Sequence, residues 1–388
     1  MRHIYKKAFC IYGAKSVYQL DIGQSSEHKV APHSEYVRIR EGRMGMLVAL
    51  LYKKLSGSRV RCQTCQWQCT IGPGKLGVCR MYQNNDGVLY NLNYADASSV
   101  AVDPIEKKPL FHFFPGSRVF SLGTWGCNFH CKHCQNWQIS CTDPSIIGRS
   151  SQTISPQDAV AMAKRERCQG IAWTYNEPAI WFEYTLDSAK IAKKQGLYTV
   201  YVTNGFISSE ALDKIGPYLD GYCVDVKGFT DSLYQDLATV TKWRGILDVT
   251  ERAKHKWGMH VEVVTNVIPT MNDDDEQLEG IATWIRDKLG ELTPWHVSRF
   301  YPQYQMLDLP ATPVATLERA YDIGKKVGLR FVYTGNVPGH DNEKTMCYSC
   351  GNLIIGRTGY HINVVGLEGS RCRFCGADLY MRAEGRSK

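Results

Sequence analysis

Three cysteines on one short stretch offer the most reactive chemistry in the sequence. Cys127, Cys131 and Cys134 follow a C-x3-C-x2-C spacing directly after the apolar run 119–122, and glycines precede the first of them. An apolar run followed by glycine predicts a strand that ends in a loop. Three thiolates on such a loop can bind three irons of a [4Fe–4S] cluster and leave the fourth iron without a protein ligand. We therefore expect a cluster whose open iron can bind a substrate or a cofactor, as catalytic metal sites do.

The alternative for this stretch is a zinc knuckle completed by His130, His133 or His112. Structural zinc sites are usually built from two short ligand pairs, and one three-cysteine loop does not have that form. The spacing therefore favours the cluster, and the residues further along the chain should decide between the two.

The sequence after these cysteines alternates strand and helix patterns, and this alternation predicts the fold class. Further strands are predicted at 171–174, 198–202, 222–226, 260–267, 295–300 and 330–333. The helices predicted between them cover 155–167, 180–194, 208–215, 230–257 in two pieces, 273–289 and 313–327. Strands separated by helices form parallel βα units. We expect an α/β fold with a partial (β/α)6-type TIM barrel, whose active residues lie at the C-terminal ends of the strands.

Polar side chains stand at those strand ends, one set for each unit of the predicted barrel. They are Asn176 and Glu177, followed by Pro178, after the second strand, Thr203 and Asn204 after the third, Asp225 and Lys227 at the fourth, Asn266 on the fifth and His296 on the sixth. A ligand with an ammonium, a carboxylate, a ribose and an adenine needs such a mixture of acceptors, a cation and hydrogen-bonding groups. Each residue alone also has an ordinary explanation as a turn, a solvated strand end or a structural histidine. Their common placement beside the cysteine loop favours a binding site.

A second group of cysteines precedes the barrel. Cys62, Cys65, Cys69 and Cys79 lie within eighteen residues that contain glycine turns. Four thiolates can close a tetrahedral shell around one zinc ion, or they can hold an auxiliary iron–sulfur cluster. The spacing does not separate zinc from a second cluster, and either would stabilise a segment that has little core of its own.

The C-terminal cysteines form two CxxCG knuckles. Cys347 and Cys350 make the first, and Cys372 and Cys375 make the second, about twenty residues further on. This spacing is typical of a zinc ribbon, with rubredoxin-type iron as the main alternative. Such a domain could be a structural clip over the open end of the partial barrel, or it could dock a substrate or a partner.

The charge distribution argues against a nucleic-acid-binding protein. The net charge is +8, but residues 1–46 carry +4 and residues 341–388 carry +2, so only +2 remains on the middle of the chain. A core so close to neutral offers no basic stripe for phosphates. The apolar run 44–52 falls far short of the roughly 18 residues of a membrane span, and we see no signal peptide. We expect a cytoplasmic protein that does not bind a membrane.

Four regions are expected from these patterns. A basic extension covers residues 1–45, a four-cysteine metal-binding module with short strands covers 46–115, the barrel covers 116–337, and the zinc-ribbon-like domain covers 338–388.

The motifs together resemble a known group, the radical S-adenosylmethionine (SAM) enzyme of the AmmeMemoRadiSam system, which is related to pyruvate formate-lyase activating enzyme. The resemblance spans about residues 47–382. It is carried by the four-cysteine module, the stretch 102–113, the cysteine loop, Tyr-Asn-Glu-Pro at 175–178, Val-Thr-Asn-Gly at 202–205, Gly-Asn-Val-Pro-Gly-His at 335–340, and the final CxxC pair.

The resemblance implies a role for each matching residue. Cys127, Cys131 and Cys134 would hold the [4Fe–4S] cluster, while Asn176, Glu177 and Pro178 stand where the superfamily contacts the SAM amine. Lys227, beside Asp225, would contact the SAM carboxylate, and Thr203, Asn204, Asn266 and His296 would complete the site. His133 stands where the superfamily usually has Phe or Tyr against the adenine, and its ring can also stack there.

The implied reaction is the reductive cleavage of SAM to a 5′-deoxyadenosyl radical that takes a hydrogen atom from an unidentified substrate. An electron donor such as a ferredoxin or flavodoxin would serve it, and the substrate could be a peptide or protein. One alternative is a glycyl-radical-enzyme activase that acts on a protein backbone. The non-enzymatic alternative is an adaptor whose zinc modules bind protein or nucleic acid, but an adaptor would not need carboxylate and lysine groups gathered at one rim.

Overall fold

The computed structural model describes residues 36–37, 46–147 and 152–383. The basic extension expected at residues 1–45 lies outside the described residues, apart from the short strand β1 (Tyr36–Val37). In the described part of the chain, no helix is long and apolar enough to cross a membrane.

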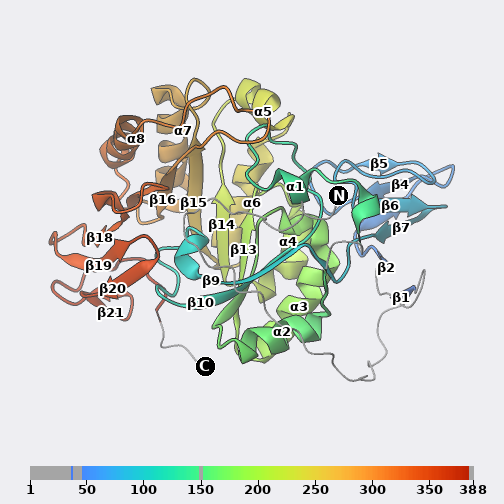
Figure 1. Cartoon of the computed structure of the whole chain (residues 1–388), viewed down its shortest axis with the longest axis horizontal. Coiled ribbons are helices and arrows are strands. Elements are labelled where there is room, and N and C mark those ends of the chain that lie inside the picture. The colour runs from blue at the N-terminus through green and yellow to red at the C-terminus, as the bar shows by residue number, and fades with distance from the viewer. Residues whose placement is uncertain (1–35, 38–45, 148–151, 384–388) are drawn as a thin grey trace, which may run out of the picture.

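An open eight-stranded sheet forms the centre of the molecule (Figure 1). Its strands are β9 (Ser99–Pro104), β10 (Arg118–Gly123), β12 (Gly170–Trp173), β13 (Tyr198–Thr203), β14 (Gly221–Asp225), β15 (His260–Val267), β16 (Trp295–Arg299) and β17 (Val332–Gly335). From β10 to β17 the strands are parallel and follow chain order across the sheet, while β9 pairs antiparallel with β10 at one edge. The predicted α/β partial barrel is therefore confirmed, with seven parallel strands in place of about six.

Helices and short helical turns connect the parallel strands, and one turn lies before the first of these strands and one after the last. The α-helices are α1 (Trp137–Ser140), α2 (Pro156–Arg165), α3 (Phe182–Lys194), α4 (Ser209–Ile215), α5 (Asp231–Ala238), α6 (Arg244–His255), α7 (Asp275–Trp284) and α8 (Val314–Val327). The single turns are Ile105–Lys107, Pro144–Ile146, Pro178–Trp181, Gly216–Tyr218, Asp341–Glu343 and the wider turn Ile285–Leu289 that extends α7.

Side-chain caps explain why several of these helices begin where they do. The Ser155 hydroxyl accepts a hydrogen bond from the Asp158 amide at 3.0 Å, and Pro156 occupies the first turn of α2. Asp274 caps α7 in the same way through the Gln277 amide. A cap removes an unpaired amide from the first turn, and proline there loses no hydrogen bond, so both starts could be predicted from the sequence.

The N-terminal module consists of small antiparallel sheets. One sheet has the order β1, β2 (Met46–Val48), β7 (Val88–Asn91), β6 (Tyr82–Asn85), and another has the order β3 (Tyr52–Lys54), β4 (Val60–Cys62), β5 (Thr70–Ile71). A third pair joins β8 (Asp96–Ala97) to β11 (Gln152–Thr153). The turn between β6 and β7 holds Asp86 and Gly87 with positive φ, as the Asp-Gly hairpin signal requires.

The expected boundary at residue 115 does not match the sheet. Strand β9 lies within the stretch assigned to the four-cysteine module, yet it forms the edge of the central sheet through six paired positions with β10. We call residues 105–117, which follow β9, the floor segment. Ile105, Leu110 and Phe113 of this segment pack with interior residues of β10, β12 and β13, so it fills the inside of the partial barrel.

The C-terminal domain contains β18 (Thr345–Met346), β19 (Leu353–Thr358), β20 (His361–Val364), β21 (Leu367–Glu368) and β22 (Arg371–Cys372). Figure 1 shows it in red at one end of the molecule, with the blue N-terminal module at the other. Arg357 Nη2 donates to the Phe111 carbonyl at 2.8 Å, and the Arg382 amide donates to the His112 carbonyl at 2.7 Å. The domain is thus fastened to the floor segment.

Candidate functional site

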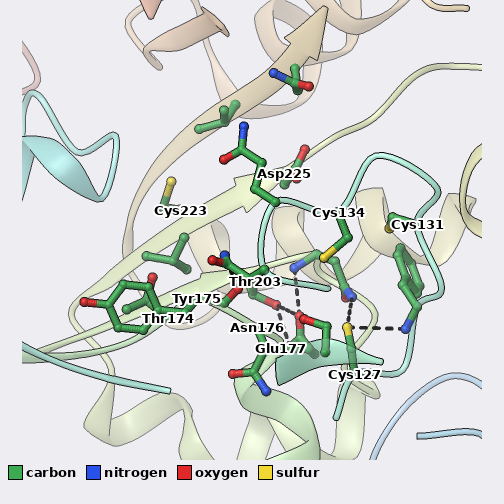
Figure 2. A pocket seen from close by; sticks show the side chains of 18 of the residues that line it. Cys127, Cys131, Cys134, Thr174, Tyr175, Asn176, Glu177, Thr203, Cys223 and Asp225 are labelled. Carbon is green, nitrogen blue, oxygen red and sulfur yellow. Dashed lines mark hydrogen bonds between the residues drawn. The ribbon is translucent and has the colours of Figure 1, made fainter. Parts of the chain in front are cut away.

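A cavity of about 240 Å³ lies at the C-terminal ends of the parallel strands (Figure 2). It brings together most of the residues that the sequence singled out, from loops and strands far apart in the chain. Those that line it are Cys127, Cys131, His133, Cys134, Asn176, Glu177, Thr203, Asn204, Asp225, Lys227 and Asn266. The strand ends of a partial barrel therefore converge on the three-cysteine loop, as expected from parallel βα units.

The cysteine loop leaves β10 through a glycine that no other residue can replace without strain. Gly126 has φ +83°, and a Cβ placed there would lie 2.7 Å from Met81 Cγ and 2.9 Å from the carbonyl oxygen of Cys79. Both the backbone conformation and the close approach require a residue without a Cβ. The loop is thereby pressed against the N-terminal module just before Cys127.

Asn176 fastens the same loop from the end of β12. Its Nδ2 donates to the Gly126 carbonyl at 2.6 Å, and its Oδ1 accepts from the Thr124 amide at 3.2 Å. On the next turn of the loop, Asn136 Nδ2 donates to the Tyr175 carbonyl at 2.7 Å. The side-chain amide of Asn176 is thus occupied by the loop backbone, which makes it a positioning group for the cysteines.

Glu177 joins the ends of β12 and β13 below the cavity. Its carboxylate accepts hydrogen bonds from the Thr203 hydroxyl at 2.8 Å and from the Asn204 amide at 2.8 Å, and it also caps the turn at Pro178–Trp181 through the Ala179 amide. Burial raises the pKa of Glu177 to about 7, although these donors favour the charged form. A carboxylate that is 1% exposed and lines the cavity can accept one more donor from a ligand.

An ion pair between a buried lysine and a partly exposed aspartate stands on the far side of the cavity. Lys227 Nζ lies 2.6 Å from Asp225 Oδ2, and the lysine side chain is 8% exposed. Burial opposes the lysine charge, but Asp225 and the neighbouring Cys131 hold the pKa of Lys227 above its usual range. The ammonium therefore stays charged beside the cysteine loop, where it can bind an anionic ligand group.

Three polar atoms in the cavity wall have no hydrogen-bond partner in the described structure. They are His133 Nδ1, Asp225 Oδ1 and Asn266 Oδ1, and all three are buried. Burial lowers the pKa of His133 well below its ordinary value, and Lys227 adds to the effect, so its ring is neutral. Buried polar atoms are rarely left unpaired in folded proteins, so the cavity fits a polar ligand that supplies the missing partners.

His296 does not belong to this group. It lies near the start of β16, and its Nε2 is 2.7 Å from Glu262 Oε2, on the side of the sheet packed against Phe111 and Tyr333. The sequence placed it on the sixth strand correctly, but near the N-terminal end of the predicted range 295–300, away from the strand ends that line the cavity. Pro178 is buried within its turn and does not line the cavity either.

Several cavity residues escaped the sequence reasoning. Lys107 and Lys108 of the floor segment line the cavity, and both ammonium groups pair with Asp103, at 2.9 and 2.6 Å. Tyr175 donates to the same carboxylate at 2.7 Å and has φ +74°, an uncommon conformation for a residue with a side chain. The Glu-Lys-Lys motif at 106–108 was visible, but nothing in its spacing showed that it enters the barrel.

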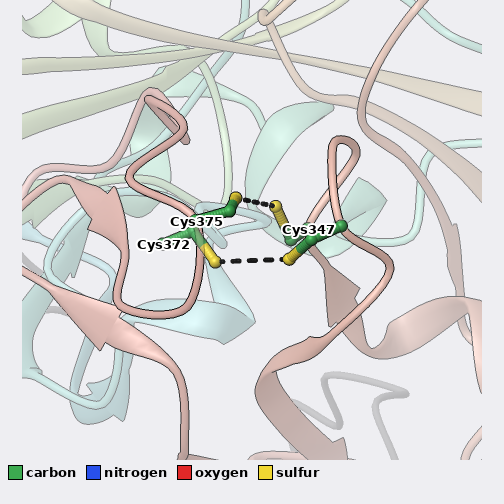
Figure 3. Close-up of side chains that lie close together, drawn as sticks. Cys347, Cys372 and Cys375 are labelled. Atoms are coloured by element: carbon green, nitrogen blue, oxygen red, sulfur yellow. Dashed lines mark hydrogen bonds between the residues drawn. The ribbon is translucent and has the colours of Figure 1, made fainter.

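The C-terminal knuckles bring their four cysteines together (Figure 3). Cys347 Sγ lies 3.6 Å from Cys375 Sγ, Cys350 Sγ lies 3.7 Å from Cys372 Sγ, and all four sulfurs are within 4.8 Å of one another. A tetrahedral ion with metal–sulfur bonds of about 2.3 Å needs sulfurs about 3.8 Å apart. The group therefore has the geometry of a site for one metal ion.

The N-terminal cysteines also share one place in the structure. Cys62, Cys65, Cys69 and Cys79 all line a second, smaller cavity between the module and the turn at Pro178–Trp181. Their sulfurs are less closely gathered than those of the C-terminal knuckles, because no three of them lie within 4.8 Å of one another.

Comparison with known proteins places these features in a family. The profile of the Radical SAM superfamily matches residues 123–285. An uncharacterized protein of Methanocaldococcus jannaschii is 42% identical over 336 residues, which cover 86% of this chain and 99% of that protein. The alignment with a putative glycyl-radical enzyme activating enzyme of the same organism shows 26% identity and covers 44% of this chain and 63% of that enzyme. The alignment with the pyruvate formate-lyase 1-activating enzyme of Escherichia coli shows 25% identity and covers 47% of this chain and 75% of that enzyme.

The matched profile begins at the last residue of β10 and contains all three cysteines of the loop at the cavity. The chain is also similar to the activating enzymes over 44–47% of its length. The alignment with the archaeal relative covers 86% of the chain, so it reaches beyond the matched profile on either side. The chain belongs to the radical SAM superfamily.

Proposed function

We propose that the three-cysteine loop holds a [4Fe–4S] cluster whose open iron binds SAM, and that the chain uses SAM to abstract hydrogen from a second substrate. The observation that carries the proposal is that His133, Asp225 and Asn266, each with one buried unpaired polar atom, line the same cavity as the three thiols. A reduced cluster bound there would supply one electron, which breaks a carbon–sulfur bond of SAM to give methionine and a 5′-deoxyadenosyl radical.

The residues around the loop divide the work of binding SAM. Lys227, held by Asp225, would bind the SAM carboxylate, because a buried ammonium is the strongest partner for that group here. Glu177 would accept from the SAM amine, together with Thr203. The His133 ring would stack on the adenine, and Asn266 would accept from a hydroxyl or an amine.

The direct test is SAM cleavage by the anaerobically reconstituted full chain with dithionite. We expect 5′-deoxyadenosine, measured by liquid chromatography, and we expect Cys131→Ala to abolish it because that variant removes a thiol of the loop. Cys168→Ala is the matched control, since Cys168 is a buried thiol outside the three cysteine groups. Wild-type protein that carries the central cluster and still never cleaves SAM would refute the proposal.

The substrate is a separate question, and two relationships bear on it. The motif resemblance supports membership of the AmmeMemoRadiSam system, in which the substrate would be tied to the two companion proteins of that system. Homology to activating enzymes supports the alternative of a glycyl-radical activase, which would act on a protein backbone. A glycyl-radical signal in electron paramagnetic resonance spectra, formed on an added glycyl-radical enzyme, would favour the activase. Deoxyadenosine formation stimulated by the companion proteins would favour the first assignment.

The flanking regions would support this reaction. Within the region expected at 46–115, we propose that the part before β9 is a four-cysteine metal module that holds the cysteine loop in place. We also propose a zinc ribbon over residues 338–388 that closes the barrel below the floor segment. The bond from Arg357 to the Phe111 carbonyl supports the second role. A ferredoxin or flavodoxin in the cytoplasm would supply the electrons. An adaptor function without chemistry is less favoured, because it leaves the buried Lys227 and its pairing with Asp225 at the cavity unexplained.

A further inference from the structure

The cavity of the N-terminal module is lined by four thiols and otherwise mainly by apolar groups. The remaining wall consists of Thr64, Trp67, Ile71, Gly77, Tyr82, Ala179 and Ile180. Cys62 and Cys65 are buried, while Cys69 and Cys79 are half-buried. A group of four cysteines around one apolar cavity is the ligand set of a metal centre, and the module has little other core to hold its short strands.

The sulfur spacing of the N-terminal cysteines can be compared with that of the two other cysteine groups in the same molecule. The C-terminal sulfurs lie within 4.8 Å of one another, the spacing that a single ion needs. In the part of the chain that the structure describes, they are the one group of ligands gathered that tightly. The three thiols of the central loop line one cavity at a wider spacing, and so do the four thiols of the N-terminal module.

The wider spacing has a chemical meaning. Thiolates that share one zinc ion must touch one another around it, whereas each thiolate of a [4Fe–4S] cluster binds a different iron and stands at a different corner. We infer that Cys62, Cys65, Cys69 and Cys79 hold a second iron–sulfur cluster, closed by four protein thiolates, and not the zinc ion that their spacing in the sequence also allows. Such a cluster would have no open iron and would leave SAM binding to the central loop.

The N-terminal cavity and the central loop share a wall. Trp67, which lines the N-terminal cavity, donates from Nε1 to the carbonyl of Asn128 at 2.8 Å, and Asn128 directly follows Cys127 of the central loop. The backbone of Cys79 also lies close to Gly126, because a Cβ placed on Gly126 would be only 2.9 Å from the Cys79 carbonyl oxygen. The indole ring of Trp67 and the backbone at Cys79 therefore connect the N-terminal cavity to the central loop, so a closed cluster in the module would lie next to that loop.

Metal analysis of the anaerobically reconstituted full chain tests the inference. We expect about eight irons and eight sulfides per chain if both clusters are [4Fe–4S], with about one zinc bound by the C-terminal knuckles. Cys65→Ser should remove about half of the iron and leave the zinc unchanged, and Cys131→Ala should remove the other half. Cys168→Ala should retain all of it. Mössbauer spectra of the Cys131→Ala protein should show the N-terminal cluster alone.

Four irons and two zinc ions in the wild-type protein would overturn the inference, as would loss of zinc but not of iron from Cys65→Ser. The wild-type metal content decides the question even where a variant does not fold. The outcome is independent of the proposed function, because iron can be counted in the module whether or not the central loop cleaves SAM.

Discussion

An unpaired carboxylate oxygen is costly in a protein interior, and Asp225 carries one at the edge of the cavity. Its other oxygen is bonded to Lys227, so the carboxylate is only half satisfied within the chain. Leaving a buried polar atom without a partner costs about 1–3 kcal/mol. His133, Asp225 and Asn266 each lack a hydrogen-bond partner for one buried atom within the described chain, and a polar ligand in the cavity could supply these partners.

Lys227 can be tested against a lysine in a similar ion pair outside the cavity. We expect Lys227→Gln to raise the Kd for SAM by about 10–100-fold, because a hydrogen bond to a charged group is worth about 1.5–3 kcal/mol. Lys193, which lies 2.6 Å from Asp220 on the outside of the sheet, is the matched control. Lys193→Gln should leave the Kd unchanged. Equilibrium dialysis of SAM against the reconstituted proteins measures both, and equal affinities for Lys227→Gln and wild type would exclude Lys227 from the SAM site.

The residue scale also shows how far the sequence could predict the site. The cysteine loop and the polar strand ends were predictable because their spacing is local and parallel strands bring their C-terminal ends together. The two hydrogen bonds between the Asn176 side chain and the loop backbone were not predictable, because they depend on the exact path of residues 124–126. His296 was grouped with the strand ends because it lies on the sixth strand, although position 296 is near the N-terminal end of that strand.

The cysteine loop keeps its shape through contacts with three other elements. The N-terminal module presses on Gly126, the end of β12 supplies Asn176, and the end of β13 supplies Asn204, whose Nδ2 donates to Asn128 Oδ1 at 2.8 Å. A loop fixed from three directions can hold its thiols in place before a cluster binds. The sequence predicted the β-units but not β9, because a short antiparallel edge strand looks like part of the preceding module.

Gly126 offers a test of this support with a close control. Gly126→Ala combines a left-handed backbone with a Cβ 2.9 Å from the Cys79 carbonyl, so we expect loss of iron from the central loop and of SAM cleavage. Gly196→Ala has a similar backbone, φ +75°, but no atom within 4 Å of the new Cβ. It should cost about 1–2 kcal/mol of stability for the left-handed conformation and keep the cluster. Equal iron contents in the two variants would show that the contact with the module is dispensable.

Across the whole molecule, one buried polar network joins the barrel to the C-terminal domain. Glu262 of β15 accepts from the backbone amides of Phe111 and His112 and lies 3.0 Å from His260 Nε2. Burial opposes its charge, but its bonds to His260 and His296 keep the pKa of Glu262 below its usual range. His112 continues the network to Tyr333 at 2.6 Å and to the Leu379 carbonyl at 2.8 Å. The sequence showed the motif around His112 but not the distant carboxylate that holds it.

The network predicts a pH dependence of stability. Burial lowers the pKa of His112 to about 3, and His260 and Arg357 add to the effect while Glu262 opposes it. Below pH 6.5 the His112 ring binds a proton in the unfolded chain but stays neutral in the folded chain. The free energy of unfolding therefore falls as the pH drops from 6.5 toward 3. Between about pH 6.5 and pH 5 the loss should be about 2 kcal/mol, at about 1.4 kcal/mol per pH unit.

Urea denaturation of the metal-loaded chain at about pH 6.5 and about pH 5 measures this loss. His112→Gln removes the titrating ring, so it should be less stable at both pH values but should show a smaller difference between them. The metal content must be the same at both pH values, because thiolates also release metal as they gain protons. An unchanged pH difference in His112→Gln would show that another group causes it.

The floor segment has a consequence for how the chain is made. It follows β9 and precedes every parallel strand, yet Phe111 is fixed by Glu262, 151 residues later, and His112 by Leu379, 267 residues later. Contacts between residues so far apart in the sequence form slowly. Until they form, the apolar side chains of the floor segment stay exposed. During synthesis the first four-cysteine module leaves the ribosome before the turn at Pro178–Trp181 that completes the wall of its cavity. We expect the inside of the barrel to close last, once the C-terminal knuckles have left the ribosome.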